Sequence, residues 1–200
     1  MKINKSILVS FILLVVVSAL YRAWDGRPFG FAPQIAMAIF GGAVIKDKRW
    51  AILMPLLSIF LSDLLYEALY VNGLSTIKGF YFGEGQVTNY LLVLGLTFFG
   101  FLMRRINILN VIAFSISGSL LFFITSNFFT WLGGGGFARP KTWDGLLLCY
   151  NDALAFYREY GVIKGFVGNI LLGDLFFSFI LFGSYYLLSK TLLQPKQQLA

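Results

Sequence analysis

The chain has 200 residues, of which 58% are hydrophobic and 12% are charged, and its mean hydropathy is +0.78. A water-soluble domain of this length could not bury so much apolar surface, so these values exclude a soluble globular protein. The chain has no histidine and a single cysteine, which excludes Ser-His or Cys-His catalysis and an internal disulfide. The formal charge is +7, but the basic residues cluster at the ends of apolar segments, so we interpret them as membrane-topology signals and expect no nucleic-acid binding.

Six apolar segments follow one another along the chain, and we expect each to form a helix that crosses the membrane. A crossing needs about 20 residues. The third, fifth and sixth segments are long enough. The first reaches this length if it continues to Trp24, and the fourth reaches it if it begins near Gly85. The second is short and begins at Pro33, a residue type that suits the first turn of a helix. The segments are Ile7–Leu20, Ala32–Ile45, Ala51–Val71, Tyr90–Met103, Ile108–Leu132 and Phe166–Leu188. The predicted fold is therefore an all-α membrane protein, a six-transmembrane-helix bundle in a single domain over residues 1–200.

The charges favour an orientation with both termini in the cytoplasm. With the N-terminus inside, the inner segments carry nine basic residues and one acid, whereas the outer segments carry seven basic residues and five acids. Short loops rich in Lys and Arg stay in the cytoplasm, so we expect a multi-pass protein of the cell inner membrane. The run Ile7–Val17 after two lysines also resembles a signal peptide. Its removal would leave five spans and break the charge bias, so we expect it to be retained.

The predicted inner connections are tight and the outer loops Asn72–Thr88 and Gly133–Lys164 are long, so we expect the working surface on the outside. The second of these loops begins with four consecutive glycines. They lack the Lys-Ser/Thr of a phosphate-binding loop, so we interpret them as a hinge. Within the same loop, Trp143–Tyr160 has apolar residues at helical spacing with polar interruptions. This pattern predicts a short amphipathic helix that either lies on the outer interface or folds back as a lid.

Three carboxylates fall inside apolar segments, where an ionised acid is costly unless it has a partner or faces a cavity. Asp63 and Glu67 are four residues apart, so they share a helix face near the outer end of the third segment. Either both line an outward-open cavity that binds a cation or a proton, or Asp63 pairs with an arginine and Glu67 is solvated. Asp174 lies in the middle of the last segment. We expect it to face the bundle, either as a ligand-binding group or as a structural link, with Asn127, Ser126 or an outer-loop arginine as its partner.

Other candidates lie at the outer ends of the predicted helices. Arg22 and Arg27 flank the first outer loop, either as surface anchors or as clamps for a carboxylate or phosphate. Asn127 and Trp131 lie at the level of the outer carboxylates, although a tryptophan there is also typical of the interface. We predict no metal site and no cofactor. The predicted substrate-binding residues are Arg22, Arg27, Asp63, Glu67, Asn127, Trp131, Tyr150 and Asp174.

Small residues recur on two faces of the predicted second helix and on one face of the fifth. Spacing of this kind lets helices approach closely, either within the chain or with a partner. The residues are Ala32, Ala36 and Ala43, then Ala38, Gly41 and Gly42, and, on the fifth helix, Ser115, Gly118 and Ser119.

Ten short stretches carry a resemblance: Arg27-Pro28, Phe40-Gly41-Gly42-Ala43, Ser62-Asp63, Thr125-Ser126-Asn127-Phe128, Trp131, Pro140-Lys141-Thr142, Gly145-Leu146, Cys149-Tyr150, Gly173-Asp174-Leu175-Phe176 and Leu181-Phe182-Gly183. In this order, over most of the chain, they resemble an uncharacterised bacterial family of small integral membrane proteins. That family is similar in size and helix count to the S-components of energy-coupling factor transporters. The likeness implies an S-component-like bundle whose outer loops close over a micronutrient. It also implies two kinds of partner, an energy-coupling transmembrane protein and ATPases.

Two non-enzymatic functions stay open at this point. The first is a substrate-binding membrane subunit that takes up a small solute or micronutrient with a separate ATP-driven coupling module. The alternative is a membrane scaffold or assembly protein of the rod-shape-determining type, in which Asp63 and Asp174 are buried links. A cavity of about 300 Å³ or more would favour the first, and a filled interior with paired acids would favour the second. An intramembrane enzyme is the weakest hypothesis, because without histidine only carboxylates could catalyse.

Overall fold

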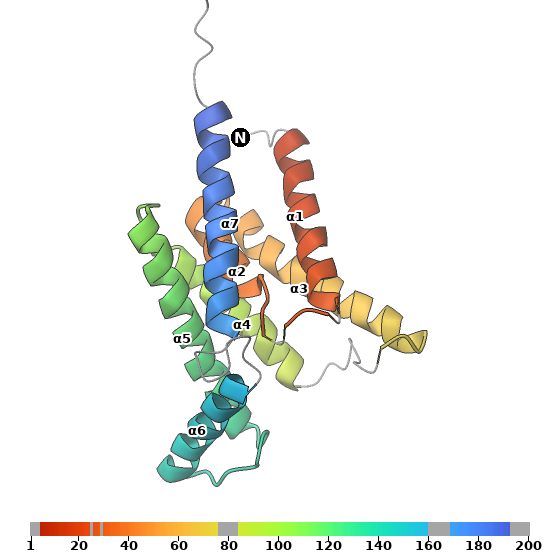
Figure 1. The fold of residues 1–200 in the computed structure, drawn as a ribbon, viewed down its shortest axis with the longest axis vertical. Coiled ribbons are helices and arrows are strands. Elements are labelled where there is room, and N and C mark those ends of the chain that lie inside the picture. Colours follow the sequence, from red (N-terminus) through yellow and green to blue (C-terminus); the bar gives the residue numbers. More distant parts are fainter. Residues whose placement is uncertain (1–4, 25, 29, 76–83, 160–168, 193–200) are drawn as a thin grey trace, which may run out of the picture.

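The structure is a computed structural model that describes residues 5–24, 26–28, 30–75, 84–159 and 169–192. Within these ranges the protein is all-helical. The helices are α1 (Lys5–Ala23), α2 (Gln34–Val44), α3 (Lys48–Val71), α4 (Glu84–Gly100), α5 (Ile108–Leu132), α6 (Trp143–Glu159) and α7 (Asn169–Leu192) (Figure 1). Residues 76–83 and 160–164 of the predicted outer loops, and both chain ends, lie outside the described ranges.

Three described segments are long and apolar enough to cross a membrane: all of α3, all of α5, and residues 170–189 of α7. They indicate a membrane protein. The six-span prediction goes further than this finding, because α2 has only 11 residues. At about 1.5 Å per residue it covers roughly half of a hydrocarbon core about 30 Å thick. A complete set of six spans is therefore still a prediction.

Helix α2 forms the centre of the packed core and contacts α3, α4, α5 and α7. Every residue from Ile35 to Gly42 is buried, as expected for a helix that is apolar on all sides. Its glycines allow very close approach. A Cβ on Gly42 would lie 2.3 Å from the Thr97 carbonyl oxygen of α4, and one on Gly41 would lie 2.9 Å from the Ala51 carbonyl oxygen of α3. The small residues of α2 therefore serve contacts within the chain.

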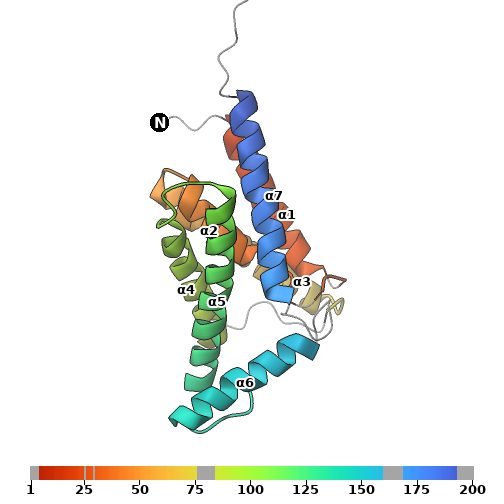
Figure 2. The same cartoon turned by 60° about the vertical axis from the view of Figure 1, so that its left-hand side comes forward.

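The two ends of the molecule differ in what they contain. Helix α1 begins and α7 ends at one end, and the short connections α2–α3 and α4–α5 lie toward it (Figure 2). Helix α6 lies at the opposite end, across the end of α5, and is called here the α6 end of the molecule. Helix α1 runs toward the α6 end, and the first loop follows it there.

Candidate functional site

Polar side chains from α1, α3 and α4 converge on Asp63, which is 4% exposed. Its Oδ1 accepts from Nη1 of Arg22 at 2.6 Å, and its Oδ2 accepts from Gln86 at 3.0 Å and from the Tyr90 hydroxyl at 2.9 Å. A buried carboxylate needs such donors, because an unpaired charge away from water is strongly unfavourable. Of the two interpretations of Asp63, the structure shows the one in which it pairs with an arginine.

The first loop is folded back onto this group of side chains. The Arg22 carbonyl accepts from Nε of Arg27 at 2.7 Å and from the Tyr66 hydroxyl at 2.5 Å. This carbonyl belongs to the last turn of α1, where helical carbonyls have no donor from their own helix. Nη2 of Arg27 also donates to the Tyr66 hydroxyl at 3.3 Å, while Nη1 of Arg22 donates to the Ser62 hydroxyl. We call Arg22, Arg27, Ser62, Asp63, Tyr66, Gln86 and Tyr90 the arginine cluster.

Asp174 belongs to a second polar group, between α5 and α7. It is 1% exposed, and its Oδ2 accepts from the Ser119 hydroxyl at 2.5 Å. One turn before Ser119 on α5 and one turn after Asp174 on α7, the hydroxyls of Ser115 and Ser178 bond to each other at 2.8 Å. Gly173 next to Asp174 packs against the chain at the start of α2, where its Cβ would lie 3.1 Å from the Ala32 nitrogen. As predicted, Asp174 faces the bundle.

The predicted partners Asn127 and Ser126 were wrong. The Asn127 amide donates to the Phe123 carbonyl of its own helix at 2.7 Å, and the Ser126 hydroxyl points to the same carbonyl at 3.3 Å. Asn127 lies eight residues beyond Ser119, which is about 12 Å along a helix. The actual partner, Ser119, had been assigned only a packing role by its position among small residues.

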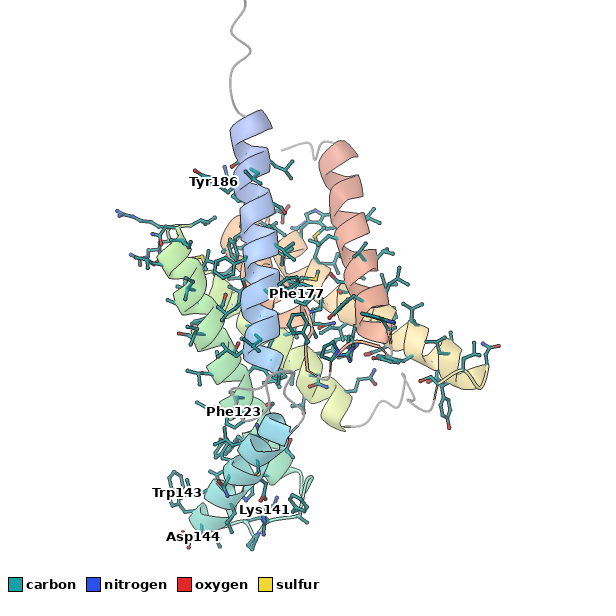
Figure 3. The ribbon with its side chains drawn as sticks, in the orientation of Figure 1. Phe123, Lys141, Trp143, Asp144, Phe177 and Tyr186 are labelled. Carbon is teal, nitrogen blue, oxygen red and sulfur yellow. The ribbon has the colours of Figure 1, made fainter. Side chains whose placement is uncertain are left out.

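The candidates Asn127, Trp131 and Tyr150 lie where α6 and the loop before it pack against the end of α5. The Tyr150 hydroxyl donates to the Ile124 carbonyl at 3.0 Å, the Cys149 thiol lies 3.8 Å from the Asn127 carbonyl, and the Trp131 indole donates to the Pro140 carbonyl at 2.8 Å. The predicted amphipathic stretch is confirmed as a helix, α6, from Trp143 to Glu159. Figure 3 shows Lys141, Trp143 and Asp144 at this end, far from Phe177 in the middle of the bundle.

An ion pair fixes the loop before α6 to the helix itself. Nε and Nη2 of Arg139 donate to the two carboxylate oxygens of Asp152 at 2.8 and 3.0 Å. These hydrogen bonds to the guanidinium hold the pKa of the Asp152 carboxyl below its usual value. On the same helix, burial raises the pKa of the Cys149 thiol, which favours the neutral form.

The eight predicted site residues therefore lie in three places. Arg22, Arg27 and Asp63 come together, with the half-buried Glu67 one residue beyond Tyr66 on the same helix. The Asn127, Trp131 and Tyr150 group lies at the α5–α6 junction, and Asp174 lies between α5 and α7. The sequence reasoning missed Gln86 and Tyr90. Their spacing of four residues at the start of α4 puts both on one face, and this was the signal available.

One small cavity lies between α1, α2 and α3, away from all three groups. Its volume is about 10 Å³, which is roughly room for one water molecule, and its walls are apolar. A solute does not fit there. It is lined by Leu14, Met37, Phe40, Gly41, Ile45 and Met54.

Fold and composition together define a small all-helical membrane protein. The chain belongs to the family of unknown function DUF6580, whose model matches residues 1–197. The predicted membership of an uncharacterised membrane family is thus confirmed. No curated protein and no solved structure matches the chain. The likeness to S-components therefore stays a prediction.

Proposed function

We propose that the protein is a substrate-binding membrane subunit, which captures a small solute from the outer side and passes it inward with a separate ATP-driven coupling module. The observation that supports this most is the arginine cluster. It gathers charged and hydrogen-bonding side chains from three helices and the first loop at the point where the chain turns between α1 and α2. Binding sites need such convergent polar groups on a rigid apolar frame.

The proposal places both termini and the basic connections in the cytoplasm of the cell and α6 outside. In its support, the α2–α3 connection with Lys46 and the α4–α5 connection with Arg104 and Arg105 lie toward the end where α1 begins and α7 ends (Figure 2). Lysine and arginine next to spans favour the cytoplasmic side. All six predicted segments cross the membrane in this scheme, with α2 surrounded by protein in place of lipid.

The coupling partner in this proposal is a transmembrane protein with attached ATPases, as the resemblance implies. The face of α2 that carries Gly41 and Gly42 is occupied by α3 and α4, so it is not available to the partner. A partner therefore has to contact another helix. We propose no enzymatic activity and no cofactor, since solute capture requires neither.

A scaffold or assembly role is the second candidate, and two observations favour it. The cavity between α1, α2 and α3 has a volume of about 10 Å³, far below the roughly 300 Å³ that would favour solute capture. Both buried carboxylates have hydrogen-bond donors, Asp63 from three side chains and Asp174 from Ser119, as expected for helix links. In that case the arginine cluster would fix the first loop to α3 and bind nothing.

Native mass spectrometry of the protein purified in mild detergent tests the two candidates. The solute-capture proposal predicts a bound small molecule, or a complex with an ATPase module. Tyr66→Phe removes the hydroxyl shared by Arg22 and Arg27 and should lower the ligand occupancy. Tyr70→Phe is the matched control, because it makes the same change at an exposed position one turn along α3. It should leave the ligand occupancy unchanged. Ligand-free protein that assembles only with itself would favour the scaffold.

A further inference from the structure

We infer that the solute carries a carboxylate or phosphate group, and that the guanidinium groups of Arg22 and Arg27 bind it. This inference rests on the proposed function, because it names the class of solute that the arginine cluster would take. Three features carry it: the charge balance of the cluster, its hydrogen-bond donors that have no acceptor among the described residues, and the accessibility of Arg22.

The charges of the cluster do not balance. Arg22 is paired with Asp63 at 2.6 Å, so one cation is matched by one carboxylate. Arg27 has no carboxylate within ion-pair distance among the described residues. Its acceptors are the Arg22 carbonyl and the Tyr66 hydroxyl, which are both neutral. A half-buried cation with neutral acceptors is stabilised further by an anion.

Several guanidinium N–H groups of the cluster also have no acceptor among the residues that the structure describes. A guanidinium has five N–H groups in a planar fork. The bonds of Arg22 to described residues all come from Nη1, and those of Arg27 come from Nε and Nη2. Nε and Nη2 of Arg22 and Nη1 of Arg27 are therefore not engaged within the described part of the chain. Such forks match the paired oxygens of carboxylates and phosphates.

Tyr66 connects the two arginines. The Tyr66 hydroxyl is 3.3 Å from Nη2 of Arg27, and the guanidinium carbon of Arg22 is 5.6 Å from the centre of the same ring. Both arginines thus contact Tyr66. The Arg22 side chain retains 23% of its exposure, so a solute can reach it while Asp63 behind it is shielded. In this proposal, one anion contacts both arginines next to Tyr66.

A purely structural role for Arg27 explains only part of this arrangement. Its Nε caps the C-terminal end of α1, where the helix dipole supplies about half a negative charge. Capping therefore matches only about half of the positive charge of Arg27. Anion binding accounts for a full positive charge kept at this position.

Binding of anions to the purified protein in lipid nanodiscs tests the inference. The probes are inorganic phosphate and citrate, with chloride at equal ionic strength as the reference. We expect at least one probe to raise the thermal midpoint of the wild type, and Arg27→Gln to weaken its affinity about tenfold or more. Arg27→Lys keeps the charge but loses the fork, so its affinity should lie in between. Arg104→Gln, at an exposed arginine outside the cluster, is the control and should bind as the wild type does.

The outcomes separate the two anion classes and the two proposals. A response to phosphate alone identifies a phosphate group, and a response to citrate alone identifies a carboxylate. Equal binding to Arg27→Gln and the wild type, or no response to either probe, would overturn the inference. If native mass spectrometry then finds a neutral or cationic ligand, solute capture stands and only its anionic class fails. If it finds neither a ligand nor an ATPase module, both proposals fail.

Discussion

Substituting Gly42 by alanine should separate α2 from α4 and destabilise the whole bundle. The new Cβ would lie 2.3 Å from the Thr97 carbonyl oxygen, whereas ordinary contact begins at 3.4 Å, so the helices must move apart by about 1 Å. Gly100 and Thr97 meet the new methyl group with backbone atoms, which cannot rotate away as a side chain can. Overpacking of this kind costs about 1–3 kcal/mol.

Gly95→Ala is the matched control, because Gly95 lies in α4 and nothing lies within 4 Å of the position that its new methyl group would occupy. Both changes replace glycine by alanine inside a helix and share a gain of roughly 1 kcal/mol in helix propensity. Their difference therefore isolates the clash. In thermal unfolding at a single scan rate, we expect Gly42→Ala to melt roughly 2–12 °C below Gly95→Ala. Equal midpoints would refute the close α2–α4 packing.

Two further predictions concern the carboxylates. Asp174→Asn should unfold at nearly the wild-type temperature, because the amide oxygen still accepts from Ser119, whereas Asp174→Leu should lose about 1–3 kcal/mol; loss of ligand binding in a stable Asp174→Asn would instead make Asp174 a solute ligand. The pKa of Asp152 is lowered by Arg139, so this pair stabilises α6 above the unfolded pKa, and the contribution is lost as the pH falls below about 4. At this pH the protection of residues 143–155 from hydrogen exchange in the wild type should fall to the level found in Asp152→Asn. Protection that stays at its neutral-pH level would contradict the role of the pair.

The helices themselves were largely predictable from apolar length. The predicted fifth segment Ile108–Leu132 coincides with α5, and the third, Ala51–Val71, differs from α3 only at its start. Here a long apolar run is bounded by polar residues or glycine, and Asn107 caps α5 by accepting from the Asn110 nitrogen. The amphipathic α6 was also found, because its polar interruptions keep helical spacing.

The contacts between helices were much harder to predict. Spacing along one helix gives the face on which Asp174 lies, but not how α7 is rotated and shifted against α5, so Ser119 was not identified as its partner. The pair Arg22–Asp63 joins residues 41 apart in sequence, with the first loop, α2 and the α2–α3 connection between them. The unusual position of the short α2 at the centre follows from its glycines only once α3 and α4 are seen to pack against them.

The most direct test of solute capture at the arginine cluster is a cryo-electron microscopy structure of the protein in nanodiscs with its solute present. The account predicts density for a small anion within hydrogen-bond distance of both Arg22 and Arg27, with Asp63 still bonded to Arg22. A solute bound next to Asp174, or guanidinium groups engaged only by the protein at saturating solute, would contradict it.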